Sequence, residues 1–214
     1  MVYCFFFQAE DGIRGSVASR GLGDVYKGQS VHGDSGLDGP ELPQPKEEAL
    51  KISAFELMAK VVEESDEKIT LVPTGPLTNI AIFLLSYPHL KSKIERISLM
   101  GGSAIGGNWT ASAEFNILVD PEAADIVFKS GIPITMSGLD VTHKAQVYPE
   151  DIEKIKNQGG KVAVMVGELL EFFIKFHKEI CGWEFAPLHD PCAVAWLINP
   201  DMFTSKKLNV QIDI

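Results

Sequence analysis

Short apolar segments that alternate with helical segments constrain this chain more than any other feature. Residues 69–73, 96–100 and 132–136 are compact apolar runs of strand length. A helical segment at 78–86 follows the first run, and another begins at Pro121 after the second. The order strand, helix, strand, helix, strand is typical of a parallel sheet covered by helices. The predicted fold class is therefore α/β, a mostly parallel open sheet with helices on both faces.

Local signals mark the ends of further elements. Asp120 is the expected N-cap of a helix with Pro121 in its first turn, and Gly131 follows the expected helix end. Apolar periodicity and proline positions predict more helices, and alternation predicts a last strand. These helices are 50–62, 149–156, 162–180 and 191–198, the last opening at Asp190, and the strand is 207–214.

Composition excludes several classes of partner. The 214 residues are 45% hydrophobic and 22% charged, which is ordinary for a globular domain. With 29 acidic and 19 basic residues the net charge is −10, which would repel a phosphate backbone, so no nucleic acid partner is expected. No apolar run reaches the roughly 18 residues of a membrane span, so no membrane partner is expected. Three cysteines without metal-ligand spacing fit a reduced, cytoplasmic setting.

Loops follow the carboxyl ends of the three predicted strands. Thr74 lies in the loop after the first strand, Gly101 in the second loop and Ser137 in the third. Ligands of open α/β sheets bind beyond these strand ends, so we expect the three loops to crowd one crevice. An outward backbone carbonyl at Thr74 could ligate calcium, whereas a purely structural elbow is the more ordinary interpretation of the local sequence.

Glu114 and Asn116 lie two residues apart in the long loop after the second predicted strand. In an extended segment this spacing places both side chains on one side. A carboxylate accepts hydrogen bonds and a carboxamide both donates and accepts, so the pair suits the vicinal hydroxyls of a ribose. A polar, solvated loop is the alternative. Asn108 and the glycines of the same loop do not decide between the two.

A second polar motif, His189-Asp190-Pro191, lies at the start of the apolar helix predicted at 191–198. By itself it is explained by a helix that Asp190 caps, with Pro191 in the first turn and His189 as an ordinary loop residue. The motif also has chemical uses. A carboxylate at a helix start can ligate a hard cation, and a histidine beside it can protonate a departing nitrogen base.

The other four histidines carry weaker signals. His32 lies in a glycine-bounded loop at a predicted strand end, where it either reaches the ligand or is only solvated. The local sequence leaves these two alternatives open. His89, His143 and His177 are predicted to be surface residues.

Several stretches together resemble the inosine-uridine-preferring nucleoside hydrolases. The resemblance is collinear from Val31 to Ile214, and its motifs are specific as a set. The matching stretches are VHGDSGLDGP (31–40), LVPTGPLTNIA (71–81), LMGG (99–102), NWTASAEFN (108–116), VDPEAADIVF (119–128) and APLHDPCAVAWL (186–197). The resemblance implies a calcium-dependent N-ribohydrolase that splits a ribonucleoside into ribose and a free base, as in nucleoside salvage. Family members are commonly dimers or tetramers, which implies a homo-oligomer.

The resemblance also implies roles for single residues. Thr74 resembles the residue whose backbone carbonyl binds calcium, and Asp190 resembles a carboxylate ligand of the same ion. Glu114 and Asn116 resemble the residues that bind the ribose hydroxyls. His189 resembles the acid that protonates the leaving base. Three more residues complete the implied site: Asn108 and Met100 line the sugar pocket, and His32 faces the base.

The chain departs from the family pattern at its N-terminus. Family members begin with a strand that ends in an aspartate-rich loop, DxDxGxDD, which supplies the general base and most calcium ligands. Here the apolar run Cys4-Phe5-Phe6-Phe7 is followed only by Glu10-Asp11-Gly12, whose acidic spacing differs from that loop. We therefore expect the first βα unit, including a central strand, to be missing. Residues 1–30 are predicted to be a non-native or disordered tail, because they are rich in glycine and show no sustained periodicity after Phe7. Within residues 1–29, FFFQAEDGIRG and SRGLGDVYKGQ resemble translated sequencing-adapter sequence, and a divergent natural tail is the alternative. Residues 31–214 are then a partial hydrolase domain, cut short at its C-terminus as well.

These departures predict that the chain as written is catalytically impaired, whereas its parent protein hydrolyses ribonucleosides. The alternative is a non-catalytic ribose- or nucleoside-binding fragment or pseudoenzyme, which a ligand would stabilise without being hydrolysed. A dinucleotide-binding α/β protein is a third interpretation. It requires a glycine fingerprint after the first strand, and the sequence has none.

Overall fold

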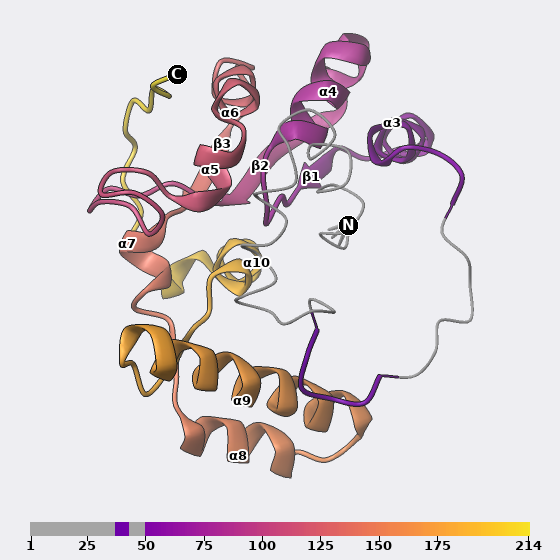
Figure 1. The fold of residues 1–214 in the computed structure, drawn as a ribbon. Coiled ribbons are helices and arrows are strands. Elements are labelled where there is room, and N and C mark those ends of the chain that lie inside the picture. The colour runs from indigo at the N-terminus through magenta and orange to yellow at the C-terminus, as the bar shows by residue number, and fades with distance from the viewer. Residues whose placement is uncertain (1–36, 43–49) are drawn as a thin grey trace. The chain divides into compact units, whose positions relative to one another are not determined.

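The structure is a computed structural model that describes residues 37–42 and 50–214 (Figure 1). These residues fall into two compact units. The first unit comprises residues 50–143 and 189–214, and the second comprises 37–42 and 144–188. Three predictions concern residues outside these ranges: the tail at 1–30, the missing first βα unit and the role of His32.

A three-stranded sheet organises the first unit. Its strands are β1 (Ile69–Leu71), β2 (Ile94–Met100) and β3 (Ile134–Ser137), in the order β1-β2-β3. The central strand β2 pairs in parallel with both neighbours, and Ile97 lies opposite Ile134 in the second pairing. The predicted parallel sheet is therefore confirmed, although β1 is shorter than expected.

Helices cover both faces of this sheet, as predicted (Figure 1). Successive residues of a strand point to opposite faces. On one face of β2, Ile97 and Leu99 belong to the core that also contains residues of three helices. On the other face, β2 contacts a fourth helix, and the Ser98 hydroxyl donates to the carbonyl of Ala193 at 2.8 Å. The first three helices are α3 (Ala54–Glu64), α4 (Thr78–Ser86) and α6 (Pro121–Phe128), and the fourth is α10 (Asp190–Ile198).

Side-chain caps explain where two of these helices begin. At α3 the Ser53 hydroxyl accepts the N–H of Glu56, and the Glu56 carboxylate accepts that of Ser53, which forms a capping box. At α6 the carboxylate of Asp120 accepts the N–H of the third helical residue at 3.1 Å, as the sequence predicts. Gly131 follows α6 with a φ of +76°, a value that favours glycine.

The first unit also contains shorter elements that fill the connections between strands and helices. They are the 3-10 turn η1 (Pro88–Lys93), the helices α5 (Phe115–Val119) and α7 (Leu139–Thr142), and the 3-10 turn η2 (Pro200–Met202). Helix α5 lies in the connection after β2, and α7 follows β3 directly. Both therefore begin close to the carboxyl ends of the strands.

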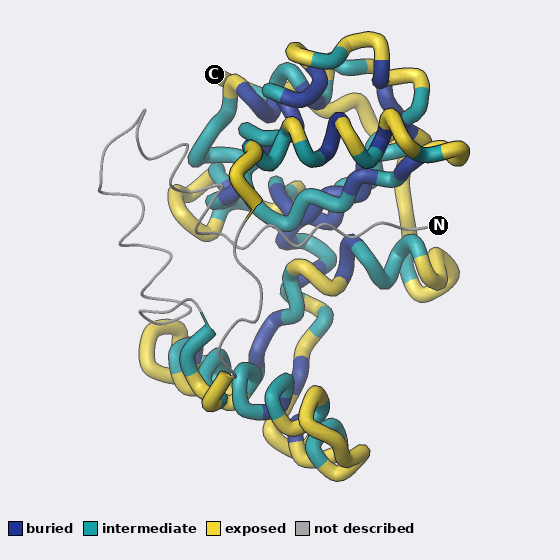
Figure 2. Tube along the Cα trace, turned by 90° about the vertical axis from the view of Figure 1, so that its right-hand side faces the viewer, coloured by how far each residue is buried: buried dark blue, intermediate teal, exposed yellow. Residues whose placement is uncertain are grey.

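Two antiparallel strands and two helices form the second unit. The elements are β4 (Gln146–Val147), α8 (Pro149–Asn157), α9 (Lys161–Cys181) and β5 (Ala186–Pro187), and β4 pairs with β5. Only Gly167 and His177 of the 21-residue α9 are buried, and Figure 2 shows these helices mostly as half-buried or exposed. Among all the helices of the described ranges, none combines the length and apolar character needed to cross a bilayer.

Four local predictions are wrong. Residues 207–214 form no strand, and the first predicted helix starts only at Ala54, which leaves Leu50 66% exposed. The segment around Asn116 is helical rather than extended, because Glu114 caps α5. Asp190 is the first residue of α10 and not its cap.

Candidate functional site

Three loops leave the carboxyl ends of β1, β2 and β3 at one edge of the sheet. The N–H of Met100 donates to the carbonyl of Pro73 in the loop after β1 at 3.0 Å. The N–H of Gly101 donates to the carbonyl of Ser137 at the end of β3 at 3.2 Å. These hydrogen bonds link the three strand ends directly. The loops that contain Thr74, Gly101 and Ser137 therefore start side by side, as the fold class led us to expect.

Glu114 is a buried carboxylate at this edge, with 4% of its surface exposed. It accepts the N–H of Gly102 at 2.9 Å and, as N-cap of α5, that of Ile117 at 3.2 Å. Burial raises the pKa of Glu114 above its ordinary value, and the backbone N–H groups around it, including that of Asn116, oppose this shift. The carboxylate is thus a fixed acceptor in a place with little water.

Asn116 ties the ends of two strands together. It is 8% exposed, and its Nδ2 donates to the carbonyl of Met100 at 3.2 Å. The same Nδ2 lies 3.2 Å from the sulfur of Met100 and 3.5 Å from the carbonyl oxygen of Thr74. Thr74, Met100 and Asn116, which the sequence singled out separately, are therefore in direct contact.

Asn108 lies in the glycine-rich loop that leads from β2 to α5. It is exposed, and its side-chain oxygen accepts the N–H of Phe115 at 3.0 Å. The ring of the neighbouring Trp109 packs edge-on against Phe115, with ring centroids 5.3 Å apart. Asn108 thus anchors the loop next to Glu114. Its predicted contact with a sugar is not tested by these interactions.

His189 lies directly before α10 and is held by the loop after β3. Its Nδ1 is 2.8 Å from the hydroxyl oxygen of Thr142, which is the last residue of α7. The ring of His143 packs edge-on against His189, with centroids 5.7 Å apart. Two consecutive residues therefore contact the imidazole, which is a more ordered setting than an ordinary loop residue would have.

Asp190 follows at the first position of α10. As a whole residue it is exposed, yet enough protein surrounds its carboxyl group to remove part of its hydration. This burial, together with the negative charge of Glu114, raises the pKa of Asp190 to about 6. The negative charge of Glu114 therefore acts on Asp190 within the first unit.

The remaining histidines differ in their surroundings. His89 is exposed, as predicted. His143 is half-buried against His189, so the surface prediction is wrong for it. The prediction is also wrong for His177 of the second unit, which is 8% exposed, lies 2.9 Å from the carbonyl of Phe173 through Nδ1 and stacks on Trp183. Burial lowers the pKa of His177.

The calcium site implied by the family resemblance is incomplete within the described residues. Within residues 37–42 and 50–214, no three carboxylate, histidine or cysteine side chains cluster as metal ligands. Calcium takes about six to eight oxygen ligands. The carboxylate of Asp190 and the carbonyl of Thr74 are two oxygen donors of the right kind, and they do not suffice to hold the ion alone.

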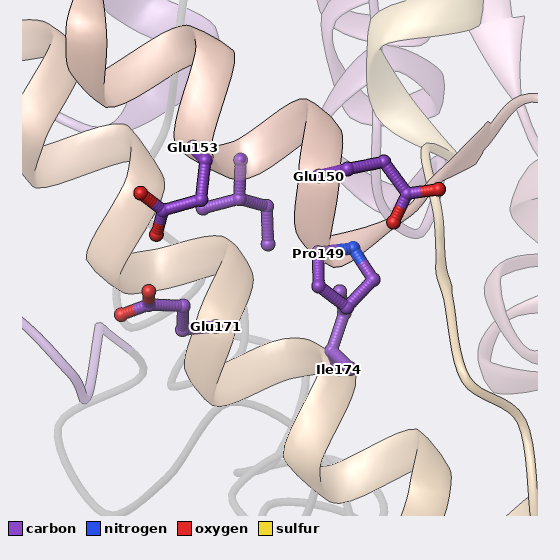
Figure 3. Close-up of a pocket in the computed structure, with 6 residues that line it drawn as sticks. Pro149, Glu150, Glu153, Glu171 and Ile174 are labelled. Carbon is purple, nitrogen blue, oxygen red and sulfur yellow. The ribbon is translucent and has the colours of Figure 1, made fainter.

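A surface hollow of about 260 Å³ lies between α8 and α9 (Figure 3). Pro149, Ile152 and Ile174 form its apolar lining, and Glu150, Glu153 and Glu171 form its acidic lining. None of the residues that the sequence singled out as site residues lines this hollow, whose lining belongs entirely to the second unit.

The chain matches the model of a known protein family. The family model for inosine-uridine preferring nucleoside hydrolase matches residues 13–214. The chain belongs to this family. The match begins within the segment 1–30 and includes the described candidate site residues Thr74, Met100, Asn108, Glu114, Asn116, His189 and Asp190.

Individual nucleoside hydrolases are similar to the chain over most of its length. The pyrimidine-specific ribonucleoside hydrolase RihA of Photobacterium profundum is 60% identical over 177 residues, covering 82% of this chain and 57% of that protein. A protein of the same name from a Shewanella strain is 59% identical over 186 residues, covering 86% and 58%. The structure of a purine-preferring ribonucleoside hydrolase from Gardnerella vaginalis matches with a TM-score of 0.81 at 35% identity, over 91% of this chain and 61% of that one. The chain spans about three fifths of the length of these relatives.

Two residues of the site were missed by sequence reasoning. Gly102 donates its N–H to Glu114, and Thr142 binds the ring of His189. Gly102 lies directly beyond β2, and Thr142 lies in α7, which directly follows β3. This position beyond strand ends is the signal that could have identified them. Neither has a side chain whose chemistry suggests a role by itself.

Proposed function

We propose that the full-length protein hydrolyses the N-glycosidic bond of ribonucleosides and releases ribose and a free base. Membership of the nucleoside hydrolase family supports this, and one structural observation carries it. The buried carboxylate of Glu114 lies among the ends of β2 and α5, near Asp190 and next to Asn116. A fixed acceptor and a carboxamide at the strand ends suit vicinal sugar hydroxyls.

On the sugar side, Glu114 has two tasks in this proposal. It accepts a hydrogen bond from a ribose hydroxyl, and its negative charge stabilises the positive charge that develops on the sugar ring as the bond breaks. The low local polarity at 4% exposure strengthens such an interaction. Asn116 offers its side-chain oxygen to a second hydroxyl, and its amide is already oriented by the carbonyls of Met100 and Thr74. Met100 and Asn108 complete the sugar pocket.

On the base side, His189 donates a proton to the leaving base. A nucleobase leaves poorly as an anion, so protonation in the transition state lowers the barrier and raises the rate, typically by a factor of about 10² to 10⁴. His32, outside the described residues, is proposed to face the base. Because the similar enzymes from Photobacterium and Shewanella are named pyrimidine-specific, we propose that pyrimidine nucleosides are the preferred substrates.

A calcium ion is part of the proposal. Asp190 and the carbonyl of Thr74 would contribute to its ligand set, and the remaining ligands would come from the aspartate-rich loop that the family pattern places at the N-terminus. When bound, the ion supplies a site that orients and acidifies the attacking water. We further propose that the parent protein is a cytoplasmic homo-oligomer, a dimer or a tetramer.

Release of uracil from uridine, and of hypoxanthine from inosine, tests the proposal. The full-length protein should release base in the presence of calcium, and the Glu114→Gln variant should be slower by about 10² or more. The 214-residue chain should show little or no turnover and only stabilisation by ribose, which is the behaviour of the non-catalytic alternative. Absence of base release by the full-length protein from either nucleoside would contradict the proposed function.

A further inference from the structure

Thr142 is a buried polar residue in contact with the histidine that the proposed mechanism uses. It is 0% exposed, and its hydroxyl oxygen lies 2.8 Å from Nδ1 of His189, a residue 47 positions further along the chain. A buried hydroxyl needs a hydrogen-bond partner, and this contact provides one. The contact therefore joins the last residue of α7 to the residue directly before α10.

The backbone around Thr142 is fixed in turn by the loop that contacts Glu114. The N–H of Thr142 donates to the carbonyl of Gly138, and the N–H of Leu139 donates to the carbonyl of Gly102, both at 3.0 Å. Gly102 is also the residue whose N–H binds the Glu114 carboxylate. A continuous series of hydrogen bonds thus connects the proposed sugar-binding carboxylate with the ring of His189.

We propose that Thr142 is a positioning residue that fixes the ring of His189 so that Nε2 faces the departing base. This inference rests on the proposed function. We assign the hydrogen of the 2.8 Å contact to Nδ1, so that the hydroxyl of Thr142 accepts it. The adjacent ring of His143 limits rotation of the imidazole. With Nδ1 held in this way, Nε2 is the nitrogen that gives up a proton.

The proton and electron balance of the step is simple. The bond between the sugar carbon and the base nitrogen breaks, and its electron pair stays with the base. The base takes a proton from Nε2. Water adds to the sugar carbon and gives its proton to the carboxylate base that the family pattern places in the aspartate-rich N-terminal loop. That carboxylate releases the proton to solvent and His189 takes one back from solvent, so the net reaction is hydrolysis. Throughout, Nδ1–H stays on His189 and donates to Thr142. Thr142 itself exchanges no proton with the substrate.

Two substrates with different leaving groups test this role in the full-length protein. Uridine needs a proton on its base, whereas p-nitrophenyl riboside releases a stable phenolate that needs none. Thr142→Val should lower kcat for uridine by about 10- to 100-fold with little change in KM, and leave p-nitrophenyl riboside hydrolysis nearly unchanged. Thr142→Ser keeps the hydroxyl and should restore uridine hydrolysis. Thr135→Val is the matched control, because it removes a hydroxyl that binds Arg96 at 3.0 Å in the same unit.

Specific results would overturn the inference. An equal loss on both substrates would indicate a merely structural role, and undiminished uridine hydrolysis by Thr142→Val would remove the role altogether. If the valine variant does not fold, Thr142→Ala, which cannot clash, must show the same substrate-dependent loss. If the unmodified protein hydrolyses neither substrate, it is the proposed function that fails.

The protonation of the His189 ring can also be measured in the unmodified protein. Imidazole ¹⁵N chemical shifts identify which ring nitrogen carries the hydrogen. In the neutral ring of His189 the hydrogen should be on Nδ1, where the Thr142 hydroxyl accepts it. A neutral ring with its hydrogen on Nε2 would overturn the inference, whatever the kinetics of the variants.

Discussion

The carboxylate of Glu114 accepts the backbone N–H of Gly102 at 2.9 Å, directly beyond the end of β2. The carbonyl of the same glycine accepts the N–H of Leu139 at the start of α7. A single peptide segment thus supports the side chain proposed to bind the sugar and the helix that holds His189. Changes in this segment should affect both sides of the site.

Gly102→Ala tests this dependence. Gly102 has a φ of +72°, and a Cβ atom there would lie 3.0 Å from the sulfur of Met136. An alanine at positive φ costs about 1 to 2 kcal/mol, and the contact with Met136 adds to that cost. Because the strain shifts the N–H away from Glu114, we expect weaker ribose binding together with a lower free energy of unfolding.

Gly131→Ala is the matched control. Gly131 has a similar φ of +76°, but it follows α6, and the nearest atom to an added Cβ is Nζ of Lys91 at 3.8 Å. This variant should lose a similar 1 kcal/mol or so from backbone strain and bind ribose normally. Equal ribose affinity in the two variants, measured by calorimetry, would contradict the account.

Two replacements of Glu114 separate charge from hydrogen bonding. The raised pKa of Glu114 means that the protein disfavours its charged form, so Glu114→Gln should maintain or increase the free energy of unfolding near neutral pH. Glu114→Ala leaves the N–H groups of Gly102 and Ile117 without their acceptor and should lose about 1 to 3 kcal/mol. Urea unfolding measures both. Equal destabilisation by the two replacements would show that the carboxylate is not the buried acceptor described here.

The parallel sheet and its helices could be predicted because the chain carries several independent signals for them. Alternating apolar segments gave the order of elements, and Asp120 marked the start of α6. The prediction of a last strand failed: residues 207–214 alternate in sequence but pair with neither edge strand of the described sheet, whose order is β1-β2-β3. Pairing partners, and not local alternation alone, decide whether a segment becomes a strand.

Asn116→Asp replaces the amide of Asn116 by a carboxyl group of the same size. When ionised, this group accepts hydrogen bonds and donates none. It would then face the carbonyls of Met100 and Thr74, which also only accept. We expect a loss of about 1 to 3 kcal/mol in the free energy of unfolding at neutral pH. The loss should shrink in acid, because a protonated carboxyl can donate to the carbonyl of Met100. A loss that is independent of pH would contradict this explanation.

The pH dependence of stability should depend on Asp190. Its folded pKa is about 6, above the ordinary value of 3.8, so the folded protein holds this proton more tightly than the unfolded chain. The resulting stabilisation is fully present below about pH 4 and is lost as the pH rises through about 6. Asp190→Asn should therefore raise Tm in the absence of calcium near pH 8, and the difference should vanish near pH 4. A lower Tm near pH 8 for the variant would reverse the sign and refute the assignment.

The candidate site could be predicted only in part. Residue chemistry and loop position identified Glu114, Asn116 and His189, because their functional groups are informative. The supports from Gly102 and Thr142 depend on a backbone N–H and on a common hydroxyl, whose directions follow from the tertiary fold. The surface prediction for His143 failed for the same reason, because its partner is 46 residues away in the sequence, at His189.

A crystal structure of the full-length protein with bound ribose tests the central claim most directly. The account predicts that the sugar lies beyond the ends of β1, β2 and β3, with ribose hydroxyls bound to Glu114 and Asn116 and the imidazole of His189 on the side of the anomeric carbon. A sugar bound elsewhere, or one bound at this edge without contact to Glu114, would contradict it.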